Sequence, residues 1–304
     1  MEWIDYFPYP CELSELVRLA IAACDELDGV KDGIISDDSA CDFDPLSVVG
    51  MSFTCSNTNT TEVVSREAAM IAKATWSNIT GVDGHFLWYG ANIGSQLSGS
   101  TTQLTNDIGP AMTSCSSNGT CVGVPLGLGE TWIKYFLEAD PRWDYSSMTK
   151  EEFENKHRES TKRYDDIIGT NNPDLAAFYN RGGKILGYHG MADQIIPVKG
   201  SEHYYDRVAE IIPQVDEFYR MFEVPGLFHC SGGPGGQPIN TFDALRAWVE
   251  NGTEPDTLVH KYTPVSGGPE LSRLLCPYPK KPVPKMGSNA MIHSSFHAEA
   301  HTCV

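Results

Sequence analysis

Apolar residues recur at helical spacing near the start of the chain. In LSELVRLAIAA (residues 13–23), positions 13, 16, 17, 19, 20 and 21 are apolar, and this spacing predicts a helix. The helix is expected to end at the acidic, glycine-containing run from Cys24 to Asp38. Three further segments have helical patterns: residues 66–79, 130–140 and 149–168. The last of these is polar on most faces, which predicts a surface position.

After residue 182, short apolar runs alternate with helical segments. A strand and loop are expected at residues 182–197, a helix at 201–212, a second strand and loop at 218–230, and a helix at 241–252. This alternation predicts a parallel sheet of the α/β class, in which reactive side chains lie just beyond the carboxyl ends of the strands. Residues 51–125 are rich in Ser, Thr, Asn and Gly, and are expected to be mostly irregular.

The composition is that of a globular protein and excludes some classes of partner. Of the 304 residues, 41% are hydrophobic and 20% are charged. A formal net charge of −18 disfavours binding to nucleic acid or to an anionic membrane, because the field of the protein repels both. No run of about 18 apolar residues could span a bilayer, and the first residues do not resemble a signal peptide.

The cysteines indicate an oxidising compartment. The chain has nine cysteines and no C-x-x-C pair, a pattern that argues against structural zinc and for disulfides. Four N-x-T sequons support the same view, and they begin at Asn59, Asn78, Asn118 and Asn251. We therefore expect a secreted, extracellular glycoprotein.

Asp193 and His229 each follow one of the two predicted strands. In the α/β-hydrolase fold, a catalytic triad has the chain order Ser, then Asp or Glu, then His, and the last two lie in loops after late strands. A carboxylate at Asp193 would accept the Nδ1 hydrogen of His229 and stabilise the imidazolium that forms when Nε2 takes a proton. Taken singly, either residue could be structural, but the strand, H-G-x-x-D, helix, strand, His order favours catalysis.

No nucleophile for such a triad is evident. A G-x-S-x-G turn would have to precede Asp193, and the sequence contains none. Ser231 follows the histidine, where the chain order of this fold forbids the role. The sequence therefore resembles the later part of an α/β-hydrolase, and we expect the chain to be inactive alone.

Several specific motifs resemble the fungal tannase and feruloyl esterase family over nearly the whole chain. These motifs are CDELDGVKDGIISD (24–37), CDFDP (41–45), LWYG (87–90), PDLAAFYNRGGKILGYHGMADQIIP (173–197) and HCSGGPG (229–235). The resemblance implies that Asp193 and His229 are the acid and base. It also implies that Cys230 matches a cysteine which, in the family, is joined to the cysteine that precedes the catalytic serine. That cysteine-serine element and everything upstream of it have no counterpart here.

The fold expected from the resemblance has two parts. Residues 1–172 would form a loop-rich cap, or lid, that contains a calcium loop, and residues 173–304 would form the C-terminal half of the α/β-hydrolase sheet. With Cys230 unpaired, the other eight cysteines can form four disulfides. Cys24 with Cys41 and Cys276 with Cys303 are the pairs we favour; Cys11 with Cys55 and Cys115 with Cys121 are weaker, because connectivity cannot be deduced from one sequence. Cys230 could instead be a buried free thiol.

The acidic loop contains Asp25, Asp28 and Asp32, with glycines at positions 29 and 33. Hard carboxylate oxygens on tight turns suit Ca²⁺, although the spacing is not that of an EF-hand. From the residues alone, a solvated acidic turn is the interpretation we favour. The resemblance implies a structural Ca²⁺ bound by the three aspartates and by the backbone oxygens of Val30 and Ile34.

The function expected is that of a carboxylic ester hydrolase acting on phenolic-acid esters. The resemblance implies small feruloyl or galloyl esters, or feruloylated polysaccharide, as substrates. One alternative is an α/β-hydrolase peptidase of the carboxypeptidase type, against which the calcium-like loop and the PDLAAF segment argue. A second alternative is a non-catalytic, calcium-stabilised secreted module.

Overall fold

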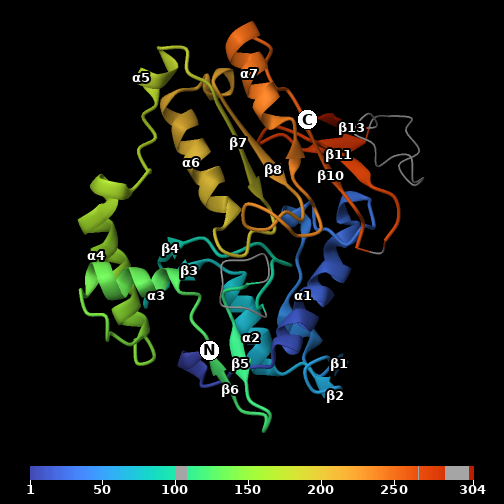
Figure 1. Cartoon of the computed structure of the whole chain (residues 1–304), viewed down its shortest axis with the longest axis vertical. Helices are drawn as coiled ribbons and strands as arrows, with labels where there is room; N and C mark the ends of the chain where they lie inside the picture. Colours follow the sequence, from blue (N-terminus) through green and yellow to red (C-terminus); the bar gives the residue numbers. More distant parts are fainter. Residues whose placement is uncertain (100–107, 266, 285–300) are drawn as a thin grey trace. The chain divides into compact units, whose positions relative to one another are not determined.

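The computed structural model describes residues 1–99, 108–265, 267–284 and 301–304, and it divides into two compact units (Figure 1). The first unit comprises Met1–Ala20 and Phe43–Asn171, and the second comprises Ile21–Asp42 and Asn172–Val304. The later boundary lies one residue from the position expected from the sequence. The acidic loop, however, belongs to the second unit and not to the expected cap region, because its aspartates contact side chains of the second unit's strands.

The core of the first unit forms between two helices. Helix α1 (Pro10–Cys24) buries Leu13, Leu16 and Ala20, which are spaced by three and four residues and therefore lie on one face. Helix α2 (Arg66–Thr75) begins at Ser65, whose side chain caps the helix by accepting from the Ala68 amide. The remaining elements of this core are short: η1 (Glu2–Ile4), η4 (Pro45–Val48), β1 (Ser52–Cys55), β2 (Thr60–Val63), β3 (Ile79–Thr80), β4 (Phe86–Trp88), β5 (Thr113–Cys115) and β6 (Cys121–Gly123).

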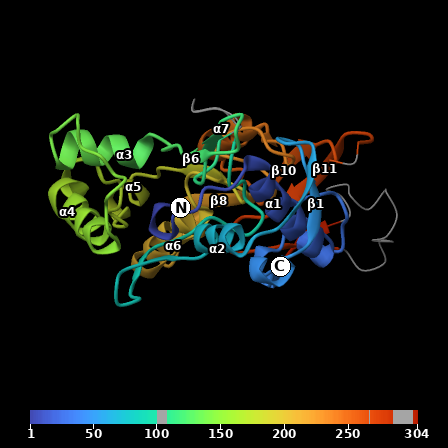
Figure 2. The ribbon, with the colours of Figure 1, turned by 90° about the horizontal axis from the view of Figure 1, so that it is seen from below.

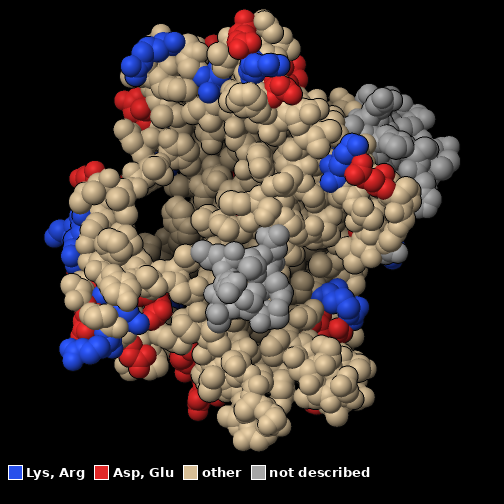
Figure 3. All heavy atoms as spheres, viewed as in Figure 1, with Lys and Arg blue, Asp and Glu red and all other residues tan. Residues whose placement is uncertain are grey.

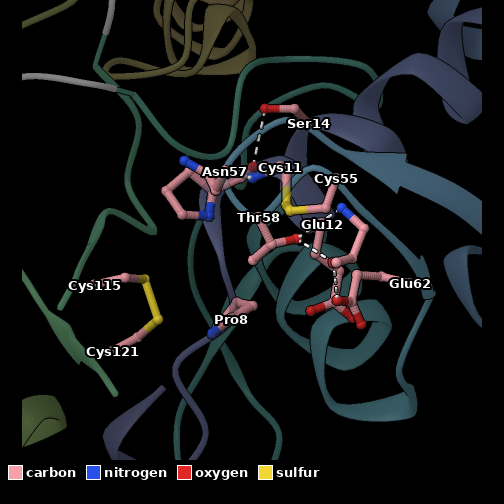
Figure 4. Close-up of a disulfide and its surroundings, with 12 residues drawn as sticks. Pro8, Cys11, Glu12, Ser14, Cys55, Asn57, Thr58, Glu62, Cys115 and Cys121 are labelled. Carbon is pink, nitrogen blue, oxygen red and sulfur yellow. Dashed lines mark hydrogen bonds between the residues drawn. A yellow bond between two sulfur atoms is a disulfide. The ribbon is translucent and has the colours of Figure 1, made fainter. Parts of the chain in front are cut away.

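These strands pair in sequence order as β1-β2, β3-β4 and β5-β6, each pair antiparallel. Two disulfides hold this region, Cys11–Cys55 and Cys115–Cys121. The first joins the start of α1 to β1, and the Cys11 amide also donates to Asn57 (Figure 4). Besides the expected helix, the segment expected to be mostly irregular thus contains three hairpins, because pairing and disulfides stabilise strands too short to be recognised from their pattern.

A helical hairpin completes the first unit. Helix α3 (Leu128–Trp132) continues into the π-helix η5 (Ile133–Leu137), and α4 (Lys150–Ile168) lies beside them in both ribbon views (Figures 1 and 2). Trp132 stacks on Phe136 and meets Tyr164 of α4 edge to face. Helix α4 begins with a capping box at Thr149, and its acidic and basic side chains are intermingled on the surface (Figure 3), as expected for a superficial helix.

The second unit contains the predicted α/β alternation. Strand β7 (Ile185–Gly190), helix α6 (Val198–Ile211), strand β8 (Tyr219–Val224) and helix α7 (Thr241–Asn251) follow one another, and β7 pairs with β8 in parallel. The buried residues of β8 alternate between two apolar clusters, one against α6 and one containing Leu227, Leu258 and Leu275. The short elements of this unit are η2 (Asp25–Asp28), η3 (Asp38–Ala40), α5 (Ala176–Tyr179) and η6 (Val215–Glu217).

The second unit also has an antiparallel sheet that the sequence did not reveal. Its order is β11-β10-β9, formed by Leu271–Leu275, Leu258–Tyr262 and Pro238–Ile239. Strand β10 contains His260 and Lys261, which obscure its apolar alternation. His260 is nevertheless fully buried, and burial lowers its pKa to about 4, so it is neutral at physiological pH.

Two disulfides tie the second unit together, Cys24–Cys41 and Cys276–Cys303. They are the same two pairs that were favoured from the sequence. The first closes the acidic loop on the end of α1, and the second joins the region after β11 to β13 (His301–Cys303), which pairs with β12 (Pro282–Pro284). The helices of the described residues include none that is long and apolar enough to cross a membrane.

A pair of half-buried carboxyl groups joins β8 and α6. Glu223 and Glu202 hydrogen-bond to each other, and Asp38 adds further negative charge nearby. Burial, and then the charge of Glu202, raise the pKa of Glu223 to about 9; burial also raises the pKa of Glu202. A proton is therefore retained between these two groups at neutral pH.

We expect the substitution Glu223→Gln to make the stability of the protein less dependent on pH. A carboxyl whose folded-state pKa is raised contributes stability that is complete below its unfolded pKa of 4.5 and is lost as pH rises towards about 9. The glutamine keeps a hydrogen-bond donor without titrating. Urea unfolding at pH 5, 7 and 9 should show a smaller loss of stability for this variant than for the unsubstituted protein, whereas Glu210→Gln on the exposed face of α6 should not. Parallel curves for all three proteins would disprove the shared proton.

Candidate active site

The two strands β7 and β8 bring their following loops together. Because the strands are parallel neighbours, both carboxyl ends lie at one edge of the sheet. The contact is close at Gly190, where an added Cβ would lie only 2.2 Å from the Leu227 carbonyl oxygen. Only glycine allows the loop after β8 to cross the end of β7 at this distance, and this crossing brings His229 to Asp193.

Asp193 is 4% exposed and accepts four hydrogen bonds. Its Oδ1 accepts from the amides of Ile195 and Ile196, each at 2.8 Å. Its Oδ2 accepts from Nδ1 of His229 at 3.0 Å and from Nε2 of His189 at 3.2 Å. A carboxylate has about four lone-pair sites, so all of them are used and its orientation is fixed.

These hydrogen bonds also determine the charge of Asp193. Burial by itself would raise the pKa of the carboxyl group. The hydrogen bond from His189, followed by those from the Ile196 amide, His229 and the Ile195 amide, outweighs burial and holds the pKa below its usual value. Asp193 is therefore ionised at neutral pH, as an acceptor for His229 must be.

His229 presents its other nitrogen to a pocket. Its side chain is 33% exposed, and its backbone amide donates to Gln194. With Nδ1 bonded to Asp193, Nε2 is the other polar edge of the ring, and Cys230 Sγ lies 3.9 Å from it. The pocket has a volume of about 270 Å³ and is lined by Tyr188, His189, Gly190, Asp193, Ile196, Leu227, His229 and Cys230. Such an imidazole can accept a proton from a group that enters the pocket.

Cys230 is exposed and is the free cysteine of this structure, not a buried thiol. Its φ angle of 59° lies in the left-handed region, which a non-glycine residue adopts only at a cost in free energy. The side chain thereby remains beside His229 at the rim of the pocket, where a second cysteine could reach it.

The sequence analysis missed His189. This histidine is the first residue of the H-G-x-x-D pattern, and its ring contacts Asp193 from the strand side. A signal was present, because a polar side chain four residues before the aspartate and inside an apolar strand requires a partner.

The acidic loop is organised by hydrogen bonds and by a buried arginine. Oδ1 of Asp25 accepts from the amides of residues 32, 33 and 34. Arg273 of β11 donates to Oδ2 of Asp28 at 3.0 Å and to Oδ2 of Asp32 at 2.6 Å, and Tyr262 also donates to Asp32. Asp25 and Asp32 are buried, so the loop is not a solvated acidic turn.

Some oxygens of this loop have no hydrogen-bond partner among the described residues. The clearest case is Oδ1 of Asp32, which is fully buried. Within the part of the chain that the structure describes, Oδ2 of Asp25 and the carbonyl oxygens of Val30 and Ile34 likewise accept no hydrogen bond. Asp28, by contrast, uses both oxygens, and the described residues contain no group of three His, Cys, Asp or Glu side chains arranged to hold a metal. The free oxygens fit Ca²⁺ in their chemistry, with Asp28 the least available of the expected ligands.

Comparisons with known proteins identify the family of the chain. The profile of the family described as "Tannase and feruloyl esterase" matches residues 2–298. A "Probable feruloyl esterase" of Arthroderma benhamiae is 35% identical over 92% of this chain, and a "Tannase" of Aspergillus oryzae is 29% identical over 92%. These matches cover 51% and 54% of the two relatives, so the chain spans about half of their length.

Solved structures show the same relationship. A tannin acyl hydrolase from Aspergillus niger superposes with a TM-score of 0.82 and 25% identity, covering 100% of this chain and 55% of that one. Feruloyl esterase B from Aspergillus oryzae gives a TM-score of 0.75 with 26% identity, covering 98% and 58%. The resemblance found in the motifs is therefore confirmed, and the chain belongs to the tannase and feruloyl esterase family.

Proposed function

We propose that this chain supplies the acid and the base of a serine-type carboxylic ester hydrolase. The observation that carries the proposal is the 3.0 Å hydrogen bond from His229 Nδ1 to an ionised, fully bonded Asp193, with Nε2 of the same ring open to a pocket. This is the arrangement that general-base activation of a hydroxyl requires.

The reaction needs a serine from a polypeptide segment outside these 304 residues. Its hydroxyl oxygen would attack the ester carbonyl carbon while its proton passes to Nε2 of His229. The imidazolium would then protonate the departing alcohol, leaving an acyl-serine that water hydrolyses with His229 again as the base. Asp193 would stabilise the imidazolium at both steps.

The edge of the small parallel sheet supports the need for such a segment. Within the described residues β7 has one partner strand, β8, so its other edge has unpaired backbone groups. An unpaired edge is a template for a further strand. An upstream segment could pair here and present its serine beside the pocket, with Cys230 joined to a cysteine next to that serine.

We infer the substrate class from the names of the relatives. They are feruloyl esterases and tannases, which points to esters of phenolic acids with sugars or other alcohols. Family membership favours an esterase over a carboxypeptidase-type peptidase. The first unit would then be the cap of the hydrolase.

We also propose that the protein is secreted. Four disulfides need an oxidising compartment to persist. The asparagines of all four sequons are exposed, so glycosylation would meet no steric obstacle: Asn59, Asn78, Asn118 and Asn251.

A complementation assay tests the proposed activity. The chain alone should not hydrolyse ethyl ferulate or propyl gallate, whereas co-expression with the N-terminal half of a feruloyl esterase relative, which carries the Cys-Ser element, should produce turnover. His229→Ala in that assembly should lower kcat by roughly 10⁴-fold or more, because a triad member is lost. Ser231→Ala should leave the rate unchanged. Rapid turnover by the chain alone would refute the inference that the nucleophile lies outside these 304 residues. Binding to cell-wall polysaccharide without turnover in any assembly would favour a non-catalytic module.

We propose further that the acidic loop binds a structural Ca²⁺. The ion would be held by the free oxygens of Asp25 and Asp32 and by the carbonyl oxygens of Val30 and Ile34. Asp28 could bind it only if Arg273 no longer donated a hydrogen bond to Asp28. The ion would neutralise the carboxylates that Arg273 leaves uncompensated and would stiffen the loop.

Calcium binding should raise the free energy of unfolding. At a Ca²⁺ concentration 100-fold above Kd the gain should be about 2.7 kcal/mol, reversed by a chelator. Asp32→Asn should abolish the heat of Ca²⁺ binding measured by isothermal titration calorimetry, whereas Asp42→Asn at an exposed neighbouring position should not. Absence of binding heat and of any thermal shift in the unsubstituted protein would show that Arg273 alone serves as the cation of this loop.

A further inference from the structure

We propose that His189 is a positioning residue that holds the Asp193 carboxylate in the orientation His229 requires, an inference that rests on the proposed function for its catalytic meaning. His189 lies on β7 and approaches Asp193 from the strand, opposite to the loop that brings His229. The two imidazoles donate to the same oxygen, Oδ2, at 3.2 and 3.0 Å.

The partners of His189 fix its ring. Nε2 faces two acceptors, Oδ2 of Asp193 and the carbonyl oxygen of Ile196 at 2.9 Å, so this nitrogen carries the hydrogen. Nδ1 lies 2.8 Å from the hydroxyl of Ser201 on α6, which donates to it when the ring is neutral. The strand, the loop and the helix therefore each hold the ring, whose side chain is 15% exposed.

The same partners exclude His189 as the base itself. Both of its nitrogens are occupied by protein groups, and reaching a substrate proton would break the contacts to Ser201 or to Asp193. His229 differs, because it lines the pocket and its Nε2 has a weak contact with Cys230 Sγ, 3.9 Å away. One carboxylate thus serves two histidines with different roles: one ring is a fixed donor and the other is free to exchange a proton.

Loss of His189 would open one of the four acceptor sites of a buried carboxylate. The two loop amides hold only Oδ1, so Oδ2 could then turn away from His229 or admit water. A displacement of about 1 Å between reacting groups can lower a rate by roughly 100-fold. The expected result is a loss of alignment without loss of the fold.

Nuclear magnetic resonance of the chain as it stands tests the proposal without requiring activity. In the unsubstituted protein, the His229 Nδ1 hydrogen should give a slowly exchanging downfield signal, absent in Asp193→Asn. His189→Leu should broaden or abolish that signal and raise the pKa of Asp193, because the largest stabilising hydrogen bond to the carboxylate is gone. His189→Gln, which keeps a donor of similar reach, should restore both, and Ser201→Ala should retain most of the signal.

His189→Asn provides a second test if the leucine variant does not fold, since it is polar but too short to reach Asp193. An unchanged signal and an unchanged Asp193 pKa in the folded variants, or failure of glutamine to restore them, would overturn the positioning role. In an active assembly, His189→Leu should lower kcat by roughly 100-fold with little change in KM. Lack of activity in every assembly would contradict the proposed function but leave the resonance result standing.

Discussion

The structure of the site depends on one buried carboxylate whose acceptor sites are all used. Asp193 holds the turn that follows β7 through two amides, and it holds two imidazoles through its other oxygen. Burial opposes its ionisation, and the four donors together overcome that opposition. The charge, the loop conformation and the orientation of His229 are therefore one coupled arrangement, in which each part requires the others.

Close backbone packing makes that arrangement possible. The loop after β8 crosses the end of β7 at Gly190, where no side chain could be accommodated, and Cys230 in the same loop adopts a left-handed conformation. Both features place side chains at the rim of the pocket and not in the core. Local conformational cost at such positions is characteristic of sites that bind or react.

The second unit removes ionisable groups from solvent in three separate places, and it stabilises them in a different way in each. Asp193 is stabilised by four hydrogen-bond donors, the acidic loop by the guanidinium of Arg273, and the Glu202–Glu223 pair by a retained proton. The elements involved come from both ends of the sequence, since Asp28 and Arg273 are 245 positions apart. Charge compensation therefore ties the acidic loop to the sheet of this unit, which explains why that loop does not belong with the residues that flank it in the sequence.

The sequence by itself determined the features that are local along the chain. Apolar spacing located α1, α2, α4, α6 and α7, and the strand and helix alternation predicted the parallel pair β7 and β8. The positions just after those strands singled out Asp193 and His229 as candidates, and the structure brings the two side chains together. Tertiary structure alone decided the sharing of Asp193 with His189, the contact of Arg273 with Asp28 and Asp32, and the antiparallel sheet around His260. The physical reason is the range of the interactions: periodicity reports how a segment buries its own face, whereas hydrogen bonds and ion pairs between distant segments exist only once the chain has folded.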